Sequence, residues 1–145
     1  MNVRPAEPRD ASEWLALRAR LWPGHAGHPA EVAAYFEHPS SLGAVLVADT
    51  GGGLAGFAEI STRAYADGCI TTPVAYVEGW WVEPIHRRQG VGRALLAAAE
   101  AWALAQGLKE IASDCHLDNS PSAAAHSACG FQEVDRLVCF RKALG

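Results

Sequence analysis

The chain is short, mixed in composition and mildly acidic. It has 145 residues, 50% of them hydrophobic and 19% charged, and its 16 acidic against 12 basic side chains give a formal net charge of −4. These values fit one folded domain over residues 1–145 and argue against a disordered chain, and the acidic balance disfavours a general nucleic-acid or membrane-surface binder. A small cationic substrate suits this charge better.

The spacing of apolar residues, glycines and prolines predicts alternating strands and helices. Strands are expected at Asn2–Ala6, Ala44–Ala48, Leu54–Thr62, Val74–Val82, Leu108–Asp114 and, as a pair or as one long bent strand, Phe131–Arg141. Helices are expected from Asp10 to Leu21-Trp22, and at Glu31–Glu37, Gly90–Gln106 and Asn119–Cys129. This order predicts an α/β layer architecture.

Two local features within these elements carry more specific predictions. Asp10 and Glu13 have capping-box spacing, so Asp10 is expected to accept from the first N–H groups of a helix and Glu13 to reach back. Gly79 lies inside the clearest predicted strand. A glycine there usually marks a bulge or a place where another group approaches the backbone closely.

The cysteines indicate a reducing environment. None of the four forms a Cys-x-x-Cys pair, and the sequence shows neither a signal-peptide pattern nor an apolar run near the roughly 20 residues of a membrane span. We therefore expect reduced thiols, a cytoplasmic location and no membrane partner. His25-x-x-His28 and Cys115-His116 lack a third and a fourth ligand at metal spacing, so no metal is expected.

The turn that leads into the long helix predicts an anion site. N–H groups at a helix start favour an anion, and Gly90 and Gly92 carry no side chains that would keep a phosphate from the backbone. Arg87, Arg88 and Arg93 add positive charge. The string is neither the nucleotide-binding P-loop nor the dinucleotide fingerprint, and a glycine-rich turn that merely caps a helix is its commoner meaning.

The same residues carry a resemblance to a known family. Arg87-Arg-Gln-Gly-Val-Gly92, after Trp80-Trp-Val82, resembles the acyl-coenzyme A signature of the GNAT superfamily of N-acetyltransferases. The resemblance spans nearly the whole chain and implies the GNAT fold, a central mixed, mostly antiparallel sheet flanked by helices. A narrower resemblance to the aminoglycoside 6′-N-acetyltransferases rests on short strings: Leu21-Trp-Pro23, Tyr65, Glu78-Gly79, Ala112-Ser-Asp114, Leu117-Asp-Asn119 and Gly130-Phe-Gln-Glu133.

This resemblance implies an activity, with two alternatives. The implied reaction is acetyl transfer from acetyl-coenzyme A to the 6′-amino group of aminoglycosides, which confers antibiotic resistance. The same fold could instead acetylate a polyamine, an amino acid or a protein amine, or it could be a non-catalytic coenzyme A-binding module. A homodimer is also expected, as in similar enzymes, because Leu137–Arg141 alternates apolar and polar residues and could pair as an edge strand across a two-fold axis.

The resemblance also implies the residues of two binding sites. The backbone of Trp80, Trp81 and Val82 would hold the pantetheine arm, Asn119 would lie near the thiol, and the pyrophosphate would be held by Arg88, Gln89, Gly90, Val91, Gly92 and Arg93. The substrate pocket would comprise Trp22, Tyr65, Glu78, Asp114 and Asp135. Carboxylates and aromatic faces suit a polycationic amino sugar, although each residue also has an ordinary structural explanation, such as an ion pair for Glu78.

Acetyl transfer to an amine requires a proton acceptor and a donor for the negatively charged oxygen. Glu78 or Asp114, directly or through water, is the candidate acceptor, and the amide of Trp81 or Val82 is the candidate donor. His126 stands where many superfamily members have a tyrosine that protonates the leaving thiolate. A histidine could do the same near neutral pH, or it could be a partly exposed helix residue.

Overall fold

The computed structural model describes residues 1–38 and 43–145 and centres on a five-stranded sheet in the order β1-β2-β3-β4-β5. Neighbouring strands from β1 to β4 are antiparallel, and β4 and β5 are parallel. The strands are β1 (Asn2–Pro5), β2 (Ala44–Asp49), β3 (Leu54–Arg63), β4 (Val74–Val82) and β5 (Ile111–Ala112). The expected mixed, mostly antiparallel sheet is confirmed.

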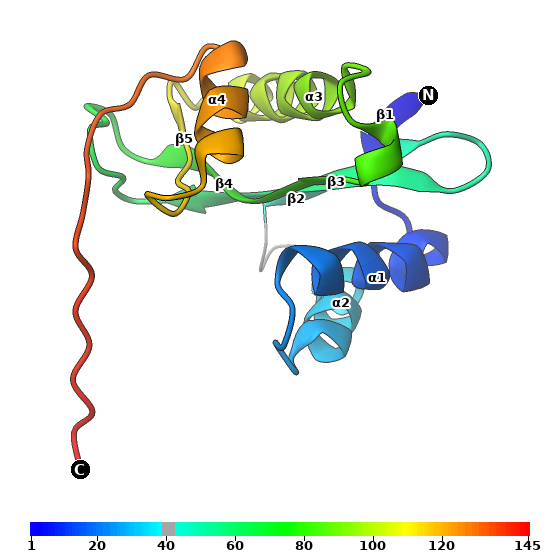
Figure 1. Ribbon diagram of the computed structural model, residues 1–145, viewed down its shortest axis with the longest axis horizontal. Helices are drawn as coiled ribbons and strands as arrows, with labels where there is room; N and C mark the ends of the chain where they lie inside the picture. The colour runs from blue at the N-terminus through cyan, green and yellow to red at the C-terminus, as the bar shows by residue number, and fades with distance from the viewer. Residues whose placement is uncertain (39–42) are drawn as a thin grey trace.

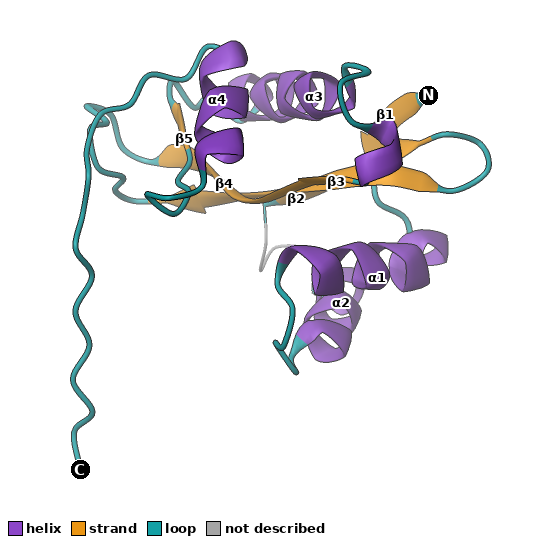
Figure 2. Cartoon of the chain, in the orientation of Figure 1, coloured by secondary structure: helices purple, strands orange, loops and turns teal. Residues whose placement is uncertain are grey.

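Helices cover both faces of the sheet (Figure 1). One face carries α1 (Ala11–Leu21) and α2 (His28–Glu37), and the other carries α3 (Val91–Ala105) and α4 (Ser120–Ala128), as Figure 2 shows. Short 3₁₀ turns, η1 (Pro8–Asp10) and η3 (Pro84–His86), precede α1 and α3. In the described parts of the chain, no helix has the length and apolar character needed to cross a membrane.

Strand β2 shows why the core has two halves. Val45 and Val47 pack with Trp14 of α1, whereas Leu46 and Ala48 pack with Leu95 of α3. Since successive side chains of a strand point to opposite faces, a strand covered on both sides has apolar residues at every position. The apolar run of β2 therefore fixes the central layer between the two helix pairs.

The capping-box prediction was wrong, although α1 begins at Ala11 as its position suggested. The Asp10 side chain accepts from the backbone N–H of Glu7 and from Arg4, so it is not free to cap α1. Glu13 instead accepts from the backbone N–H of Leu54, which ties α1 to the start of β3. A tertiary partner has replaced the local one in each case.

The C-terminal third departs most from expectation. The strand predicted over Leu108–Asp114 is reduced to Ile111–Ala112, and Phe131–Arg141, expected as strand, has neither helix nor strand. Phe131 and Val134 still contact the body, and the residues after them extend away from it (Figure 1), exposing 78% of Val138 and 91% of Phe140. Alternating residues form a strand only when they pair with another strand, and this segment pairs with none in the described chain. Helix α2 also begins earlier than predicted, at His28.

Candidate active site

A bulge in β4 sets the position of Glu78. Glu59 of β3 pairs with Gly79, and the next residue, Ile60, pairs with Val77, so Glu78 is the additional residue on the bulged strand. The bulge expected near Gly79 is therefore confirmed. Because a bulge bends the strand and redirects a side chain, it places Glu78 away from the regular pleat.

The carboxylate of Glu78 is already hydrogen-bonded and ion-paired with neighbours on β3. Its carboxylate accepts from the Ser61 hydroxyl at 2.9 Å and from Nε of Arg63 at 3.1 Å, and Nη2 of Arg63 donates to both carboxylate oxygens. This hydrogen bonding holds the pKa of Arg63 above its usual value. The Arg63 side chain is 45% exposed, so the pair opens to solvent.

Asp114 belongs to the same cluster through Tyr76. The Tyr76 hydroxyl donates to Asp114, and the guanidinium carbon of Arg63 lies 3.5 Å from the centre of the Tyr76 ring. Burial, followed by the hydrogen bond to Asp114, raises the pKa of Tyr76. The structure thus brings both predicted carboxylates around one tyrosine and one arginine, in the group Ser61, Arg63, Tyr76, Glu78 and Asp114, which we call the acidic cluster.

Trp22 lies at the end of α1 and reaches the bulge. A Cβ on Gly79 would come within 2.5 Å of the Trp22 ring, so only glycine lets the indole approach the strand this closely. The buried Arg18 guanidinium lies 5.2 Å from the centre of the Trp22 ring and forms ion pairs with Glu59 and Glu31. Burial raises the pKa of Glu59 to about 7, against the opposing effect of Arg18.

Two predicted pocket residues lie outside this network of contacts. Tyr65 belongs to the loop between β3 and β4, is 70% exposed and donates to Asp67. Asp135 lies in the extended C-terminal segment, whose Val134 packs at Gly68 of that loop. The hydrogen bond to Asp67, together with the charge of Asp135, raises the pKa of Tyr65. Tyr65 on the outer loop and Asp135 in the C-terminal segment therefore lie apart from the acidic cluster.

The end of β4 presents an unpaired strand edge. Trp80, Trp81 and Val82 pair with β3 on one side, whereas the pairing of β4 with β5 is confined to Ala75 and Tyr76. Half of the N–H and C=O groups of an extended strand point to each side, so the second side of this stretch can bind an extended ligand. Arg87 extends over this region, with Nε donating to the Val82 carbonyl and its guanidinium 4.8 Å from the Trp81 ring centre.

The turn before α3 has the backbone of an anion site. Arg88 has φ 63° and Gly90 has φ 82°, and left-handed residues in such a turn let successive N–H groups converge. The first-turn N–H groups of α3 have no intrahelical acceptor. Arg88, Gln89, Gly90 and Arg93 are exposed, whereas the Val91 side chain is buried in the core, so Val91 can offer only its backbone.

Three other residues predicted to contact coenzyme A also form hydrogen bonds within the protein. Nη2 of Arg93 donates to the carbonyl of Ala128 at the end of α4. Asn119 is the N-cap of α4, where its Oδ1 accepts from Ser122, which leaves its amide nitrogen exposed. The Trp80 indole donates to the Gly92 carbonyl, so β4 and the first turn of α3 are directly joined.

His126 of α4 has partners for both ring nitrogens. Nδ1 lies 2.7 Å from the carbonyl oxygen of Ser122, so Nδ1 carries a proton, and Nε2 lies 2.7 Å from the Ser113 hydroxyl. The ring packs between Trp80 and Phe131, with centroids 5.1 and 5.4 Å away. His126 thus joins α4 to the strand edge beside Asp114.

Sequence reasoning missed three members of the acidic cluster, Ser61, Arg63 and Tyr76. Ser61 pairs with Tyr76 across β3 and β4, and Tyr76 pairs with Ala112, two residues before Asp114. Side chains two apart on a strand share a face, so the register of the three strands would have revealed the group. That register depends on the bulge and could not be fixed from the sequence.

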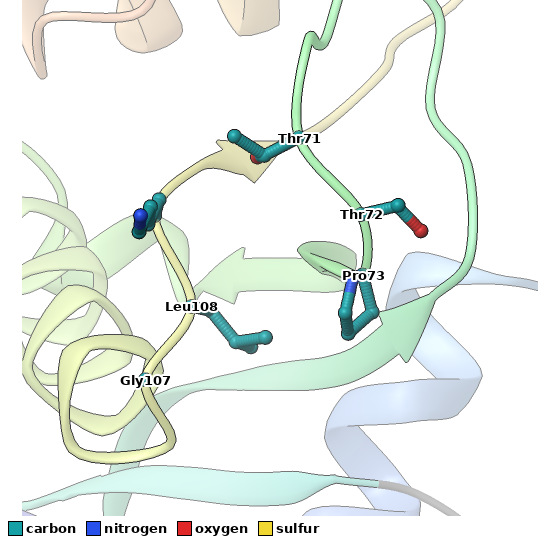
Figure 3. A pocket seen from close by; sticks show the side chains of 6 residues that line it. Thr71, Thr72, Pro73, Gly107 and Leu108 are labelled. Atoms are coloured by element: carbon teal, nitrogen blue, oxygen red, sulfur yellow. The ribbon is translucent and has the colours of Figure 1, made fainter.

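A pocket elsewhere contains none of these residues. It lies between the loop before β4 and the turn after α3, where Figure 3 shows Thr71, Thr72, Pro73, Gly107 and Leu108 around it, with Lys109 as the sixth lining residue. The carboxylate of Glu110 accepts from the backbone N–H groups of Ile70 and Thr71 beside it. The lining carries no carboxylate and no aromatic side chain, so the pocket lacks the chemistry of the acidic cluster.

Comparisons with known proteins agree with this arrangement. The model of the Acetyltransferase (GNAT) family matches residues 11–131. An aminoglycoside N(6′)-acetyltransferase type 1 from Klebsiella aerogenes is 48% identical over 98% of this chain and 96% of its own, and one from Stenotrophomonas maltophilia is 41% identical over 99% and 94%.

Solved structures give the same result. The enzyme AAC(6′)-Iy in complex with the bisubstrate analogue CoA-S-monomethyl-acetylneamine has a TM-score of 0.92 and 35% identity, covering 99% of this chain and 98% of its own. The apo 6′-N-acetyltransferase AAC(6′)-IG from Acinetobacter haemolyticus has a TM-score of 0.92 and 37% identity over 100% of both chains.

Proposed function

The chain belongs to the acetyltransferase (GNAT) family, and on that premise we propose that it transfers an acetyl group from acetyl-coenzyme A to the 6′-amino group of aminoglycosides. One observation carries the proposal. A solvent-accessible acidic cluster around Glu78 lies on the same strand as, and next to, the unpaired β4 edge that leads to an anion-binding helix start. The full-length similarity to enzymes of that name specifies the acceptor.

The residues present fit acetyl-coenzyme A. The N–H groups from Gln89 to Arg93 would hold the pyrophosphate, and the unpaired edge at Trp80–Val82 would hold the amide-bearing pantetheine arm. Acetyl-coenzyme A supplies the acetyl group as a thioester. The hydrogen bond from the Trp80 indole to the Gly92 carbonyl joins the β4 edge to the turn before α3. It would keep the bound thioester aligned with the amine, which favours the reaction.

The acidic cluster would bind the substrate as a cation and then remove a proton. An ammonium has no lone pair, so Glu78 would accept its proton, directly or through water, and Asp114 would hold a second ammonium group of the sugar. Of the two candidate β4 amides, Val82 would stabilise the negative charge that develops on the carbonyl oxygen, because its N–H faces the open edge, whereas the N–H of Trp81 faces β3. Trp22 would pack against the sugar next to Glu78, whereas Tyr65 and Asp135 would contact its outer ring.

Arg63 would act as the internal counter-ion of the free cluster. Arg63 donates to the Glu78 carboxylate, which the substrate would also have to bind. Because the Arg63 side chain is partly exposed, it can move into solvent when the substrate arrives. A polycation can replace one guanidinium with several ammonium groups. We expect Arg63 to lie aside when substrate is bound.

A panel of amines tests this proposal. Purified protein with acetyl-coenzyme A would be assayed for thiol release with kanamycin-type aminoglycosides that carry a 6′-amine, matched aminoglycosides with a 6′-hydroxyl, spermidine, free amino acids and a peptide. We expect turnover only with the 6′-amines. Equal or faster turnover of spermidine or the peptide would favour the alternative acceptor, and cofactor binding without thiol release would favour a non-catalytic module.

We also propose a homodimer that uses the C-terminal segment. Val138 and Phe140 are exposed and lie in an extended stretch that lacks a strand partner within the described chain. A second copy could supply the strand edge and bury them. Light scattering should give twice the mass of 15.4 kDa, and a chain truncated after Glu133 should give the monomer mass. A full-length particle of monomer mass at micromolar concentration would contradict the proposal.

The biological role proposed is antibiotic resistance in the cytoplasm. Acetyl-coenzyme A is a cytoplasmic metabolite, and all four cysteines have free thiols. Expression in a susceptible bacterium should raise the inhibitory concentration of 6′-amino aminoglycosides but not of 6′-hydroxyl ones. A Glu78→Gln variant expressed to the same level should not protect.

A further inference from the structure

We propose that His25, His28 and Glu31 form a binding site for a divalent transition-metal ion such as Zn²⁺. The three residues have the pattern His-x-x-His-x-x-Glu across the turn into α2. One possible ligand atom from each lies within 4.8 Å of those of the other two. The sequence offered two histidines without a third ligand, and the fold supplies that ligand as Glu31. This inference is independent of the acetyl-transfer proposal.

The histidine at the start of α2 provides the most specific observation. His28 is 3% exposed, and its Nε2 lies 2.9 Å from the backbone carbonyl oxygen of Trp22. A carbonyl only accepts, so Nε2 carries the proton and Nδ1 has a free lone pair. That Nδ1 is buried and has no hydrogen-bond partner. Metal-bound histidines typically donate their second N–H to a carbonyl in this way, which fixes the tautomer for ligation.

The other two side chains can close around an ion. Nε2 of His25 and Oε1 of Glu31 are 2.8 Å apart, and the two side chains are 48% and 45% exposed. Ligands of a tetrahedral zinc ion lie about 3.3 Å from one another, given Zn–N bonds of about 2.0–2.1 Å. Small movements of two surface side chains toward the fixed His28 would reach that geometry.

Charge and ligand chemistry select the class of metal. Arg18 holds Oε2 of Glu31 at 2.7 Å, which leaves Oε1 for the ion, and Glu59 offsets the Arg18 charge from the other side at 2.8 Å. Two imidazoles with one carboxylate favour zinc and its neighbours over calcium or magnesium, which prefer oxygen ligands. Three protein ligands leave a fourth position for water.

A simpler explanation accounts for only part of the arrangement. A surface ion pair between His25 and Glu31 would explain their contact, but it leaves the buried lone pair of His28 without a function. A metal ion would use all three groups. It would also fix the turn that carries Trp22, because His28 stacks on the Trp22 ring at 6.2 Å with 19° between the planes.

Direct metal binding tests the proposal without any assay of activity. Chelator-treated protein would be titrated with Zn²⁺ against a chromophoric competitor and separately with Co²⁺, whose absorption distinguishes thiolate from nitrogen ligation. We expect one ion per chain, no thiolate band and a melting temperature that rises with metal concentration. His25→Ala, on an exposed side chain, should weaken Zn²⁺ affinity by about tenfold or more, and Glu31→Gln should do the same.

Two variants serve as controls. His38→Ala removes an exposed histidine outside the cluster, and Cys115→Ser removes the exposed thiol beside His116, so both should bind Zn²⁺ as the parent does. The proposal is overturned if the parent protein binds no Zn²⁺, if His25→Ala binds as tightly as the parent, or if Cys115→Ser alone abolishes binding.

Discussion

The acidic cluster and the turn before α3 are the two sites that we propose to bind charge, a cation and an anion, and they are built in opposite ways. Around Glu78 the carboxylate already has partners, since Ser61 and Arg63 donate to it within the protein. In the turn, Arg88 and Gly90 hold left-handed conformations, and Arg88, Gln89 and Gly90 are all exposed to solvent. The anion site is thus built by the backbone and held ready, whereas the cation site is neutralised by a side chain that can move.

This difference separates two kinds of sensitivity. A backbone-built site fails when the conformation of the turn fails, and no single side chain decides it. A side-chain site responds to each substitution separately, and removing an internal competitor can improve binding. The following changes test this contrast, from the largest expected effect to the smallest.

The substitution Gly90→Val should abolish useful cofactor affinity. Gly90 has φ 82°, a conformation that a β-branched residue strongly disfavours, so the turn would rearrange and its N–H groups would diverge. Calorimetry should show coenzyme A affinity reduced by about 100-fold or more, since several charge-assisted bonds depend on the turn. Gly51→Val in the hairpin between β2 and β3, where φ is 87°, is the matched control for backbone strain. Equal loss in both variants would indicate general unfolding.

The substitution Glu78→Gln should reduce kcat and leave cofactor binding intact. The amide keeps the shape of the side chain but cannot accept the proton of the ammonium, and loss of a general base typically costs about 100-fold or more. Steady-state kinetics with a 6′-amino aminoglycoside and coenzyme A calorimetry on the same preparation measure both quantities. Glu37→Gln on exposed α2 should behave as the parent. Full activity of Glu78→Gln would remove Glu78 from the proposed chemistry.

The substitution Arg63→Ala should lower the KM for the aminoglycoside. Arg63 competes with the substrate for Glu78, and an exposed ion pair of this kind is worth up to about 1 kcal/mol, which corresponds to about a fivefold change. The effect should be greatest at low salt, because screening weakens the pair. A higher KM, with unchanged folding by circular dichroism, would show instead that Arg63 positions Glu78 for the substrate.

The substitution His126→Phe should have the smallest effect. Both ring nitrogens are bonded to Ser113 and Ser122, and the ring packs between two aromatic side chains, so phenylalanine preserves the packing. We expect kcat to fall by less than about twofold and the pH profile to keep its shape, because only loss of a true general acid costs about 100-fold or more. A larger loss with a missing alkaline limb would make His126 the proton donor to the thiolate.

The sequence predicted the parts of the fold whose signals are local. The bounds of β4 match the prediction, and α3 and the β2–β3 hairpin fall where apolar periodicity and glycines placed them. The capping-box prediction failed because both side chains bind more distant partners instead: Asp10 accepts from Arg4, and Glu13 accepts from the backbone at the start of β3. The segment Phe131–Arg141 has the alternation of a strand but pairs with no other strand in the described chain.

The candidate site follows the same division. The Arg-x-x-Gly-x-Gly string predicted a turn before α3, and the structure has one there, because such a turn depends on consecutive residues. Glu78 and Asp114 were found by resemblance, but Arg63 and Tyr76 were not, because they join the site through a strand register that shifts by one residue at the bulge. The local sequence does not show which residue of a neighbouring strand will lie beside a given side chain.

The close packing of Trp22 on Gly79 limits which substitutions position 79 can accept. Every side chain larger than hydrogen at position 79 would enter the space of the indole, 2.5 Å away at its nearest atom, and would displace the aromatic ring and the adjacent carboxylate together. Under the proposed function, variants with an altered preference among aminoglycosides should therefore arise at the outer loop around Tyr65 and in the C-terminal segment near Asp135, and the contact between Trp22 and Gly79 should stay fixed.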